Sequence, residues 1–282
     1  MINQEKFVYQ GGARIHGEVF LSRANYGDGV FETMRSHQGR LPLLAMHLRR
    51  LAHGLEVLGL AEMEIEKTQL ELRQIAELHP DAVIKLIAIS AAASGSYQRS
   101  HNGVEYAVVV SALPPSDALA YPEGITVRVC KTRLVQHSAL AGIKHLNRAE
   151  QILAANEPNA PSAQEGLTLD TSGQVICALA GNIFVVLDGQ LSTPIIDGAG
   201  INGVMRECIM QICTKIGVEL AVRVLKLADI CRASELFLCN AVRAIRPVAR
   251  LIDECGPEIV YTKQRPITQQ IIAELNQVAF RP

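Results

Sequence analysis

A nine-residue apolar run from Ala82 to Ser90 limits what this chain can fold into more than any other stretch. A short, continuous apolar segment is typical of a strand that is buried on both faces. Two predicted amphipathic helices, at 42–58 and 63–78, precede this run, and a second strand is expected at 104–113. The first part of the chain should therefore combine helices with a sheet in which residues 82–90 form a central strand.

Length and composition are those of a soluble globular enzyme with a sizeable core. The 282 residues, 49% hydrophobic and 20% charged, suffice for one large domain or two of ordinary size. A net charge of −1 gives no electrostatic attraction for nucleic acid or for an anionic membrane. No apolar run approaches the ~20 residues that span a bilayer, and residues 1–7 lack the apolar core of a signal peptide. We therefore expect a cytoplasmic protein that acts on a small molecule.

The seven cysteines are expected to be reduced, mostly buried thiols. Their number is odd and they form no Cys-x-x-Cys pair. Cys208 and Cys213 lie five positions apart on a predicted helix without nearby histidines, so no metal site is expected there.

A Pro-rich stretch is expected to divide the chain. Residues 114–124 contain three prolines and have a suitable length for an inter-domain linker. We therefore expect an N-terminal domain at 1–113 and a C-terminal domain at 125–282. The elements expected in the second domain are a strand at 125–131, a helix at 147–156, hairpins turning at 170–173 and 189–190, a helix ending near 216, a short helix at 227–234, a strand at 235–239 and a terminal helix at 265–277.

Lys144 is a candidate amine nucleophile. It follows a small, apolar lead-in, Leu140-Ala-Gly-Ile143, and directly precedes a predicted helix start. A lysine in a partly desolvated pocket has a lowered pKa, because burial disfavours its charged form. The neutral amine can then form a Schiff base with a carbonyl compound. Taken alone, the residue fits a solvated surface lysine at least as well, since most lysines are exposed.

Two glycine-rich turns adjoin predicted regular elements. The turn at Tyr26-Gly27-Asp28-Gly29 leads into residues 30–35, which alternate as a half-buried strand. The turn at 198–203 enters a helix, where backbone N–H groups and the positive end of the helix dipole suit a phosphate group. Each turn alone is weak support for a functional site.

The segment Gly142-Ile-Lys144-His-Leu-Asn-Arg-x-Glu-Gln151 resembles the lysine segment of the fold-type IV pyridoxal-phosphate enzymes. This family includes branched-chain and D-amino-acid aminotransferases and aminodeoxychorismate lyases. The sequence of this segment is most similar to that of the lyases. The resemblance implies a two-domain α/β (α+β) fold, with a small N-terminal α/β domain and a larger C-terminal domain that has a barrel-like sheet. It also implies a homodimer and pyridoxal 5'-phosphate held by Lys144, which is then released to act as general base and acid.

The resemblance implies further residues that hold the cofactor phosphate. Arg50, in a His-x-x-Arg-Leu motif at 47–51, matches the arginine that grips the phosphate. A guanidinium suits this role because it is a permanently charged, bidentate donor. Four other positions match residues in turns that face the phosphate: Ile201, Asn202, Asn240 and Ala241.

Other residues correspond to the substrate side of the site. Tyr26, Glu32 and Thr33 belong to a Tyr-Gly-Asp-Gly-x-Phe-Glu-Thr signature whose strand lines that side. The matching threonine is a proposed proton donor in the lyases, which makes Thr33 a second candidate catalytic residue.

The chain departs from the family pattern in two places. Cys177 stands where the family has a glutamate that pairs with the pyridine nitrogen of the cofactor, and a thiol is only a weak hydrogen-bond partner. A buried structural cysteine is an equally good interpretation of Cys177. The loop at 91–103 lacks the arginines that relatives offer to substrate carboxylates, and only Arg99 could substitute for them.

The function implied is a pyridoxal-phosphate-dependent lyase that releases pyruvate from 4-amino-4-deoxychorismate and forms 4-aminobenzoate, a folate precursor. A D-amino-acid or branched-chain aminotransferase is the first alternative. A catalytically silent relative that acts as a binding or scaffold protein is the second, and the departures at Cys177 and in the loop at 91–103 motivate it. Because an elimination driven by aromatisation depends less on a strong electron sink, Cys177 is expected to disfavour transamination more than lyase activity.

Overall fold

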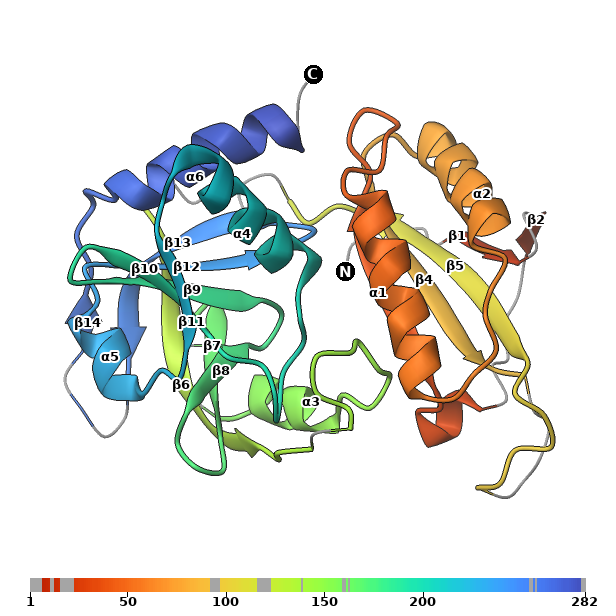
Figure 1. The fold of residues 1–282 in the computed structure, drawn as a ribbon, viewed down its shortest axis with the longest axis horizontal. Helices are drawn as coiled ribbons and strands as arrows, with labels where there is room; N and C mark the ends of the chain where they lie inside the picture. Colours follow the sequence, from red (N-terminus) through yellow and green to blue (C-terminus); the bar gives the residue numbers. More distant parts are fainter. Residues whose placement is uncertain are drawn as a thin grey trace. The chain divides into compact units, whose positions relative to one another are not determined.

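The computed structural model describes residues 7–10, 13–15, 23–91, 97–115, 123–137, 139–158, 161, 163–253, 256 and 258–279. The chain forms two compact units (Figure 1). Unit 1 comprises Met1–Pro114 with Ile143–Asn147 and Pro282, and unit 2 comprises Pro115–Gly142 and Arg148–Arg281. Most of the predicted linker, at 116–122, lies outside the described residues.

Unit 1 is built on an antiparallel sheet with the strand order β2-β1-β5-β4-β3. The strands are β1 (Phe7–Gln10), β2 (Ala13–Ile15), β3 (Gly29–Arg35), β4 (Ala82–Ser90) and β5 (Val104–Ala112). Because β4 pairs with β3 on one side and with β5 on the other, the predicted interior strand is confirmed with its predicted bounds. Deeply buried and half-buried residues alternate along most of β4, as the two different faces of the sheet require.

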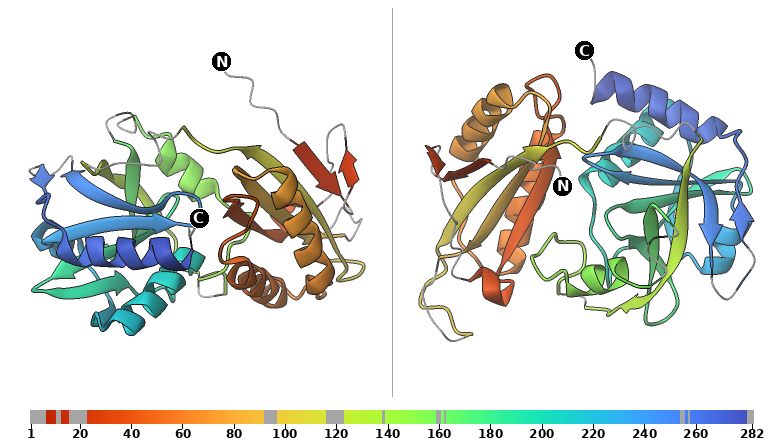
Figure 2. Two further views of the ribbon diagram at one scale, coloured as in Figure 1. Left: turned by 90° about the horizontal axis from the view of Figure 1, so that it is seen from above. Right: turned by 180° about the vertical axis from the view of Figure 1, so that it is seen from behind.

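Two helices, α1 (Leu44–Val57) and α2 (Ile65–Leu78), cover one face of this sheet (Figure 2). Leu48, Leu51 and Leu55 follow helical spacing along α1 and join Val30 and Met34 of β3 in one core. Both helices lie within two residues of their predicted ends. The opposite face of β3 carries the half-buried residues, so the two faces of the strand have different tasks.

The lysine segment Ile143–Asn147 extends the unit 1 sheet along β3. Phe31 donates its N–H to the Lys144 carbonyl at 3.0 Å, and Leu146 donates to the Gly29 carbonyl at 2.9 Å. The segment lies within the predicted C-terminal domain, 125–282, but these main-chain bonds attach it to unit 1. The unpaired side of an edge strand offers such hydrogen bonds to any segment that reaches it, so hydropathy alone did not reveal the attachment.

Unit 2 contains a mixed sheet that curls around a large hydrophobic core. The strand order is β11-β10-β9-β12-β13-β6-β7-β8, and β14 pairs with β13. Buried residues of β6, β7, β9 and β12 meet in that core, which gives the barrel-like sheet that was expected. The strands are β6 (Ile125–Leu134), β7 (Glu165–Asp170), β8 (Val175–Ala178), β9 (Asn182–Leu187), β10 (Gln190–Pro194), β11 (Leu220–Arg223), β12 (Glu235–Asn240), β13 (Ala244–Ile252) and β14 (Ile259–Val260).

Four helices were identified among the described residues of unit 2: α3 (Ala149–Ala155), α4 (Val204–Ile216), α5 (Leu227–Arg232) and α6 (Pro266–Val278). α4 and α6 pack on β12 and on each other, and Lys215 of α4 forms an ion pair with Glu274 of α6. Within the described ranges, no helix combines the length and the apolar character needed to span a membrane.

Candidate active site

The Lys144 side chain is held at the edge of the unit 1 sheet. Its Nζ lies 4.2 Å from the centroid of the Phe31 ring, whose face attracts an ammonium group electrostatically. The side chain is half-buried, which removes part of its water. The candidate nucleophile therefore lies against a defined surface of the protein and does not extend into bulk solvent.

The turn that precedes β3 packs against the lysine segment. Gly27 has a φ of +64°, and a Cβ there would overlap the side-chain amide of Asn147, which donates to the Gly27 carbonyl at 3.1 Å. A Cβ at Gly29 would overlap the carbonyl of Ala88 on β4. Gly27 is thus favoured by its left-handed backbone and by the Asn147 side chain, whereas Gly29 is required by the close approach of the β4 backbone. The hydrogen bond from Asn147 joins this turn to the segment that contains Lys144.

A second lysine lies on the same aromatic ring. The Nζ of Lys85 lies 4.6 Å from the Phe31 centroid, and Lys85 is paired in register with Thr33 across β3 and β4. Residues directly opposite each other in an antiparallel pair share a face of the sheet, as do residues two apart on one strand. Phe31, Thr33 and Lys85 therefore line one half-buried surface, next to Lys144. Sequence reasoning missed Lys85, although a lysine inside an apolar strand was an available signal.

Glu32 lies on the opposite face of β3, under helix α1. Its carboxylate is 1% exposed and accepts hydrogen bonds from His47 Nδ1 at 2.6 Å, from Arg50 Nε at 2.8 Å and from Arg50 Nη2 at 2.5 Å. Burial alone would raise the pKa of Glu32, but the hydrogen bonds from His47 and Arg50 outweigh it and leave the pKa below its usual value. Glu32, predicted as a substrate contact, thus already has both oxygens engaged by α1.

Arg99, the predicted substitute for the missing loop arginines, is also engaged. Its Nε and Nη2 donate to the Asp28 carboxylate, and its Nη1 donates to the Leu58 carbonyl at 2.8 Å. The hydrogen bond from Arg99 is the main reason that the pKa of Asp28 is lowered. The guanidinium therefore fastens the loop to the turn before β3. Residues 92–96 of this loop lie outside the described residues.

Tyr26 ends a short 3-10 helix, η1 (Ala24–Tyr26), and is 41% exposed. Its ring meets that of Tyr97 edge-on, with the centroids 5.8 Å apart, and the Arg23 guanidinium lies 5.1 Å from its centroid. The exposed part of this ring remains accessible to a ligand.

In unit 2, Cys177 is a buried thiol beside a hydroxyl group. The Cys177 Sγ lies 3.3 Å from Thr168 Oγ1, and that hydroxyl donates to the Cys177 carbonyl at 2.9 Å. Burial raises the pKa of the Cys177 thiol, although the Thr168 hydrogen bond and the nearby Arg148 charge oppose the shift. At neutral pH this position therefore presents a neutral thiol where the family pattern has a carboxylate.

The predicted phosphate-binding turn at the start of α4 is held by hydrogen bonds. Asn202 donates its N–H to the Gly142 carbonyl at 2.9 Å, and the Asn182 amide donates to the Ile201 carbonyl at 2.9 Å. Gly203 is the N-cap of α4, and a Cβ there would overlap the Asn182 side chain. Gly203 has no side chain with which to cap this helix. Its first-turn N–H groups and dipole therefore suit an anion.

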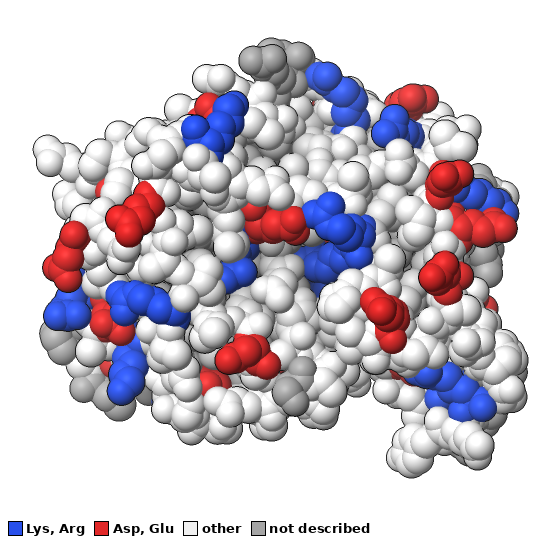
Figure 3. All heavy atoms as spheres, viewed as in Figure 1, with Lys and Arg blue, Asp and Glu red and all other residues white. Residues whose placement is uncertain are grey.

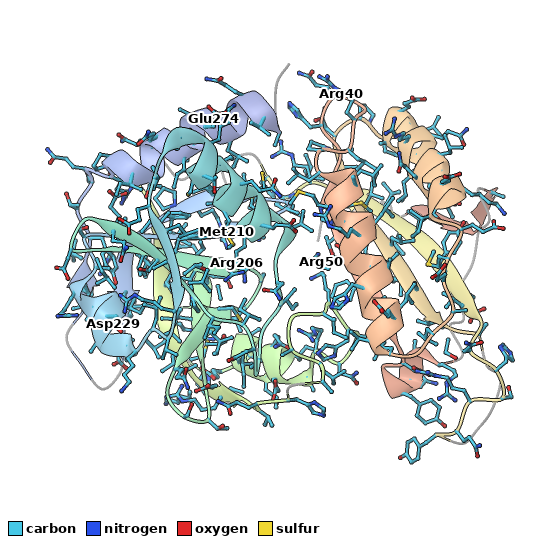
Figure 4. The ribbon with its side chains drawn as sticks, in the orientation of Figure 1. Arg40, Arg50, Arg206, Met210, Asp229 and Glu274 are labelled. Carbon is cyan, nitrogen blue, oxygen red and sulfur yellow. The ribbon has the colours of Figure 1, made fainter. Side chains whose placement is uncertain are left out.

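Arg206 braces this turn from the first turn of α4 (Figure 4). It is 7% exposed and donates to Asn202 Oδ1 at 3.3 Å, to Thr193 Oγ1 at 3.2 Å and to the Pro194 carbonyl at 3.0 Å. Burial lowers the pKa of Arg206, which nevertheless remains a cation. Arg206 is a site residue that was not predicted from the sequence, although its position just after the glycine-rich turn was an available signal.

Asn240 shapes the second predicted phosphate-facing turn, after β12. Its Oδ1 accepts from the N–H groups of Val242 at 3.0 Å and Arg243 at 2.7 Å, and its Nδ2 donates to the Ala180 carbonyl at 2.9 Å. Its side chain is thus used to build the turn that contains Ala241.

Charge and metal-ligand patterns add no further site. On the face of unit 2 drawn in Figure 3, acidic and basic side chains are interspersed. In the part of the chain that the structure describes, no group of three or more His, Cys, Asp or Glu residues could hold a metal ion.

Comparison with known proteins finds relatives in sequence and in structure. Residues 29–251 match the amino-transferase class IV family. The aminodeoxychorismate lyase of Vibrio harveyi is 33% identical over 227 residues, which cover 79% of this chain and 83% of that protein. The crystal structure of 4-amino-4-deoxychorismate lyase from Pseudomonas aeruginosa superposes with a TM-score of 0.84 at 31% identity, covering 96% of this chain and 98% of that one.

A more distant solved structure has the same fold. An aminotransferase from Brucella abortus, bound to the cofactor PLP, superposes with a TM-score of 0.79 at 20% identity and covers 98% of this chain and 99% of that one. The mixed α/β fold and the family predicted from the sequence are thus confirmed. The chain belongs to the class IV amino-transferase family.

Proposed function

We propose that this protein is a pyridoxal-phosphate-dependent lyase that converts 4-amino-4-deoxychorismate into 4-aminobenzoate and pyruvate. The observation that carries the proposal is the surface on β3 and β4, where the Lys144 and Lys85 amines flank the Phe31 ring and Thr33 lies in register with Lys85. That surface offers an amine, a second cation and a hydroxyl group in a chain that is similar to two lyases over most of its length.

The residues present fit the cofactor. Lys144 supplies the amine for its aldehyde, and the first turn of α4, whose N-cap Gly203 has no side chain, supplies backbone donors for a phosphate. When bound, pyridoxal phosphate draws electrons away from the carbon that bears the substrate's amino group. The other residues that we propose to hold the cofactor are Arg50, Cys177, Ile201, Asn202, Asn240 and Ala241.

The reaction needs one proton removed and one added. The ring carbon that bears the amino group loses a proton, the ring carbon–oxygen bond breaks, and the leaving enolpyruvyl carbon gains a proton to give pyruvate. No water, oxidant or reductant is consumed. We assign the proton removal to Lys144 and propose Thr33 as the donor to the leaving group, because both lie beside Phe31 on one surface.

The substrate's carboxylates need a cation, and in unit 1 Lys85 is the best candidate. Arg99 is already engaged by Asp28 and by the Leu58 carbonyl. Lys85 lies on the proposed substrate surface itself, where half-burial strengthens its attraction for an anion. We therefore assign a substrate carboxylate to Lys85, assign Arg99 to fastening its loop, and retain Tyr26 as an accessible substrate-side residue.

The identity of residue 177 favours elimination over transamination. A neutral thiol cannot stabilise a proton on the pyridine nitrogen as a carboxylate does. Transamination passes through a carbanion that depends on that protonated ring, whereas elimination here is also driven by formation of an aromatic product. Efficient conversion of pyruvate to alanine by the wild-type protein would favour an aminotransferase, the alternative for which the family match itself speaks.

The direct test is incubation with 4-amino-4-deoxychorismate and measurement of 4-aminobenzoate and pyruvate in equal amounts. Lys144→Ala should lose the visible absorption of the bound cofactor and at least about a thousandfold of the rate, because it removes the proposed base and covalent anchor. Wild-type protein that binds the cofactor but yields neither product would refute the lyase assignment. Protein that stays colourless with added cofactor would instead support a silent relative.

We further propose that the protein is a homodimer. On α3, Ile152 and Leu153 are 62% and 64% exposed, and Val135 after β6 is 60% exposed. Large apolar side chains exposed to this extent support a partner surface. Light scattering after size exclusion should give twice the mass of 30.6 kDa, and a monomer mass at micromolar concentration would contradict the proposal.

A further inference from the structure

The Glu32–His47–Arg50 cluster differs from the ordinary ion pairs of this protein. The side chains of Glu32 and His47 are each 1% exposed, whereas that of Arg50 is 13% exposed. The cluster therefore begins in the core of unit 1 and ends at a guanidinium that reaches toward the surface. Only one edge of the Arg50 fork, Nε and Nη2, is directed at Glu32.

The hydrogen-bond chemistry of the cluster fixes its geometry. An ionised carboxylate can only accept, so His47 Nδ1 must carry the hydrogen in the 2.6 Å bond to Glu32 Oε2. Glu32 Oε2 is thereby held between His47 and Arg50, while Oε1 accepts from Arg50 Nε. A carboxylate fixed in this way leaves the planar guanidinium with one orientation, since two parallel bonds define its plane.

A fully structural pair in unit 2 provides the contrast. Arg128 and Glu157 are 2% and 8% exposed, and Arg128 also donates to the Ala154 carbonyl. That guanidinium ends on the protein's own main chain and ties β6 to α3. Arg50 is more exposed, at 13%, and it meets Glu32 through its Nε and Nη2 edge.

We propose that Glu32 is a positioning residue that, together with His47, holds the Arg50 guanidinium in the orientation in which it binds a phosphate group. This inference rests on the proposed role of Arg50 toward the cofactor and deepens it. Pre-orienting the arginine removes the entropy loss of ordering a long side chain on binding. Glu32 thus acts on the anion through Arg50, and not on the substrate as its position in the sequence motif had suggested.

The test compares pyridoxal phosphate with pyridoxal, which has the same aldehyde but no phosphate. The full-length protein, stripped of cofactor, is titrated with each compound and followed by visible absorbance. Glu32→Gln should lower the affinity for pyridoxal phosphate on the order of tenfold, because one charge-assisted hydrogen-bond partner of Arg50 is weakened. It should change the affinity for pyridoxal less than about twofold. Arg50→Lys should do the same, and the double variant should be no weaker than Arg50→Lys alone, since the two residues act as one unit.

Glu157→Gln is the matched control, because it breaks a buried arginine pair outside the cluster. It should lower thermal stability and leave the preference for the phosphorylated compound as in the wild type. If Glu32→Gln behaves in the same way, the cluster is only structural and the proposal is overturned. Should Glu32→Gln not fold, Glu32→Asp keeps the charge but withdraws the oxygens, and it should lose part of the same preference. A protein that lacks lyase activity can still pass this test, so the two proposals fail independently.

Discussion

Unit 1 and unit 2 position their candidate residues by different means. In unit 1 the important groups are charged side chains held by other side chains, as Arg50 is by Glu32 and Lys85 by the Phe31 ring. In unit 2 they are mainly main-chain groups of two turns, shaped by Asn182 and Asn240. The difference suggests that ligand binding by unit 1 is sensitive to the loss of a charged side chain. Ligand binding by unit 2 should instead be sensitive to added side-chain volume in its turns.

The largest expected effect after loss of Lys144 comes from removing the second cation of unit 1. Lys85→Met keeps the length of the side chain on β4 but has no charge to pair with a substrate carboxylate. The KM for 4-amino-4-deoxychorismate should rise roughly 10- to 100-fold, the range expected when a charged partner of a carboxylate is lost. The absorbance of the bound cofactor should remain as in the wild type. A lower kcat with unchanged KM would show that Lys85 does not bind a substrate carboxylate.

Added volume should have its strongest effect at the turn before α4. Gly203→Ala keeps an ordinary backbone conformation, φ −69° and ψ 138°, but its Cβ would overlap the Asn182 amide that holds Ile201. We expect affinity for pyridoxal phosphate to fall about tenfold as that hydrogen bond is lost and the turn shifts.

Gly198→Ala is the control for this change, because its Cβ would lie 3.4 Å from the flexible side chain of Gln136, an ordinary contact. It should bind the cofactor as the wild type does. Equal losses of affinity in the two variants would mean that steric fit at Gly203 is not what shapes the site.

A carboxylate at Cys177 tests a position in unit 2 where we propose that a side chain itself faces the cofactor. Cys177→Glu brings a potential counter-ion into a buried position near Arg148, whose charge would help to keep it ionised. We expect the transaminase rate, measured as conversion of pyruvate to alanine, to rise relative to the lyase rate. The ratio should increase on the order of tenfold, because the ring becomes a stronger electron sink. Cys177→Ser should leave this ratio nearly unchanged. If Cys177→Glu leaves this ratio unchanged, residue 177 does not determine which of the two reactions is favoured.

The same contrast explains which features could be predicted from the sequence. Strand β4 and helices α1 and α2 were predicted to within two residues, because continuous apolar runs and helical spacing reflect burial directly. Short strands such as β11 and β14 were not, since segments of four and two residues are too short to show a hydropathy pattern. The Gly203 turn was found from its motif, but the reason that it must be glycine is the Asn182 side chain, which reaches it through the fold.

Side-chain partners in unit 1 were the hardest to predict. The motif placed Glu32 beside Thr33 on one strand, and only the alternation of β3 shows that the two residues lie on opposite faces. Arg99 matched the need for a cation in its loop, but its pairing with Asp28 spans 71 positions in the chain. Lys85 was hidden inside an apolar run, and its significance depends on register with Thr33. Local patterns identify elements, whereas the partner of a charge depends on tertiary contacts.

The smallest expected effect concerns stability in acid. It tests whether a carboxylate of unit 2 that is held by an arginine, as Glu32 is in unit 1, contributes to the stability of the fold. Glu157 of unit 2 accepts hydrogen bonds from Arg128 Nη1 at 2.5 Å and from the Thr132 N–H at 2.7 Å. Burial would raise its pKa, but these and further hydrogen bonds lower it to about 2, against 4.5 for an unperturbed glutamate. Because the folded-state pKa is the lower one, the stabilisation is complete above pH 4.5 and is lost as the pH falls toward 2.

Glu157→Gln removes this titration and should flatten the dependence of the unfolding free energy on pH between about 4.5 and 2, by up to about 1.4 kcal/mol per pH unit. Urea unfolding at a series of pH values measures the slope. Glu258→Gln is the matched control, since Glu258 also pairs with an arginine, Arg250, but is 39% exposed, where water and salt screen the interaction. If both variants change the slope equally, burial of the pair has no influence on acid stability. If only Glu157→Gln changes the slope, buried carboxylates such as Glu157 and Glu32 determine the pH below which the fold loses stability. The difference between the two units then applies to how they position site residues and not to how they resist acid.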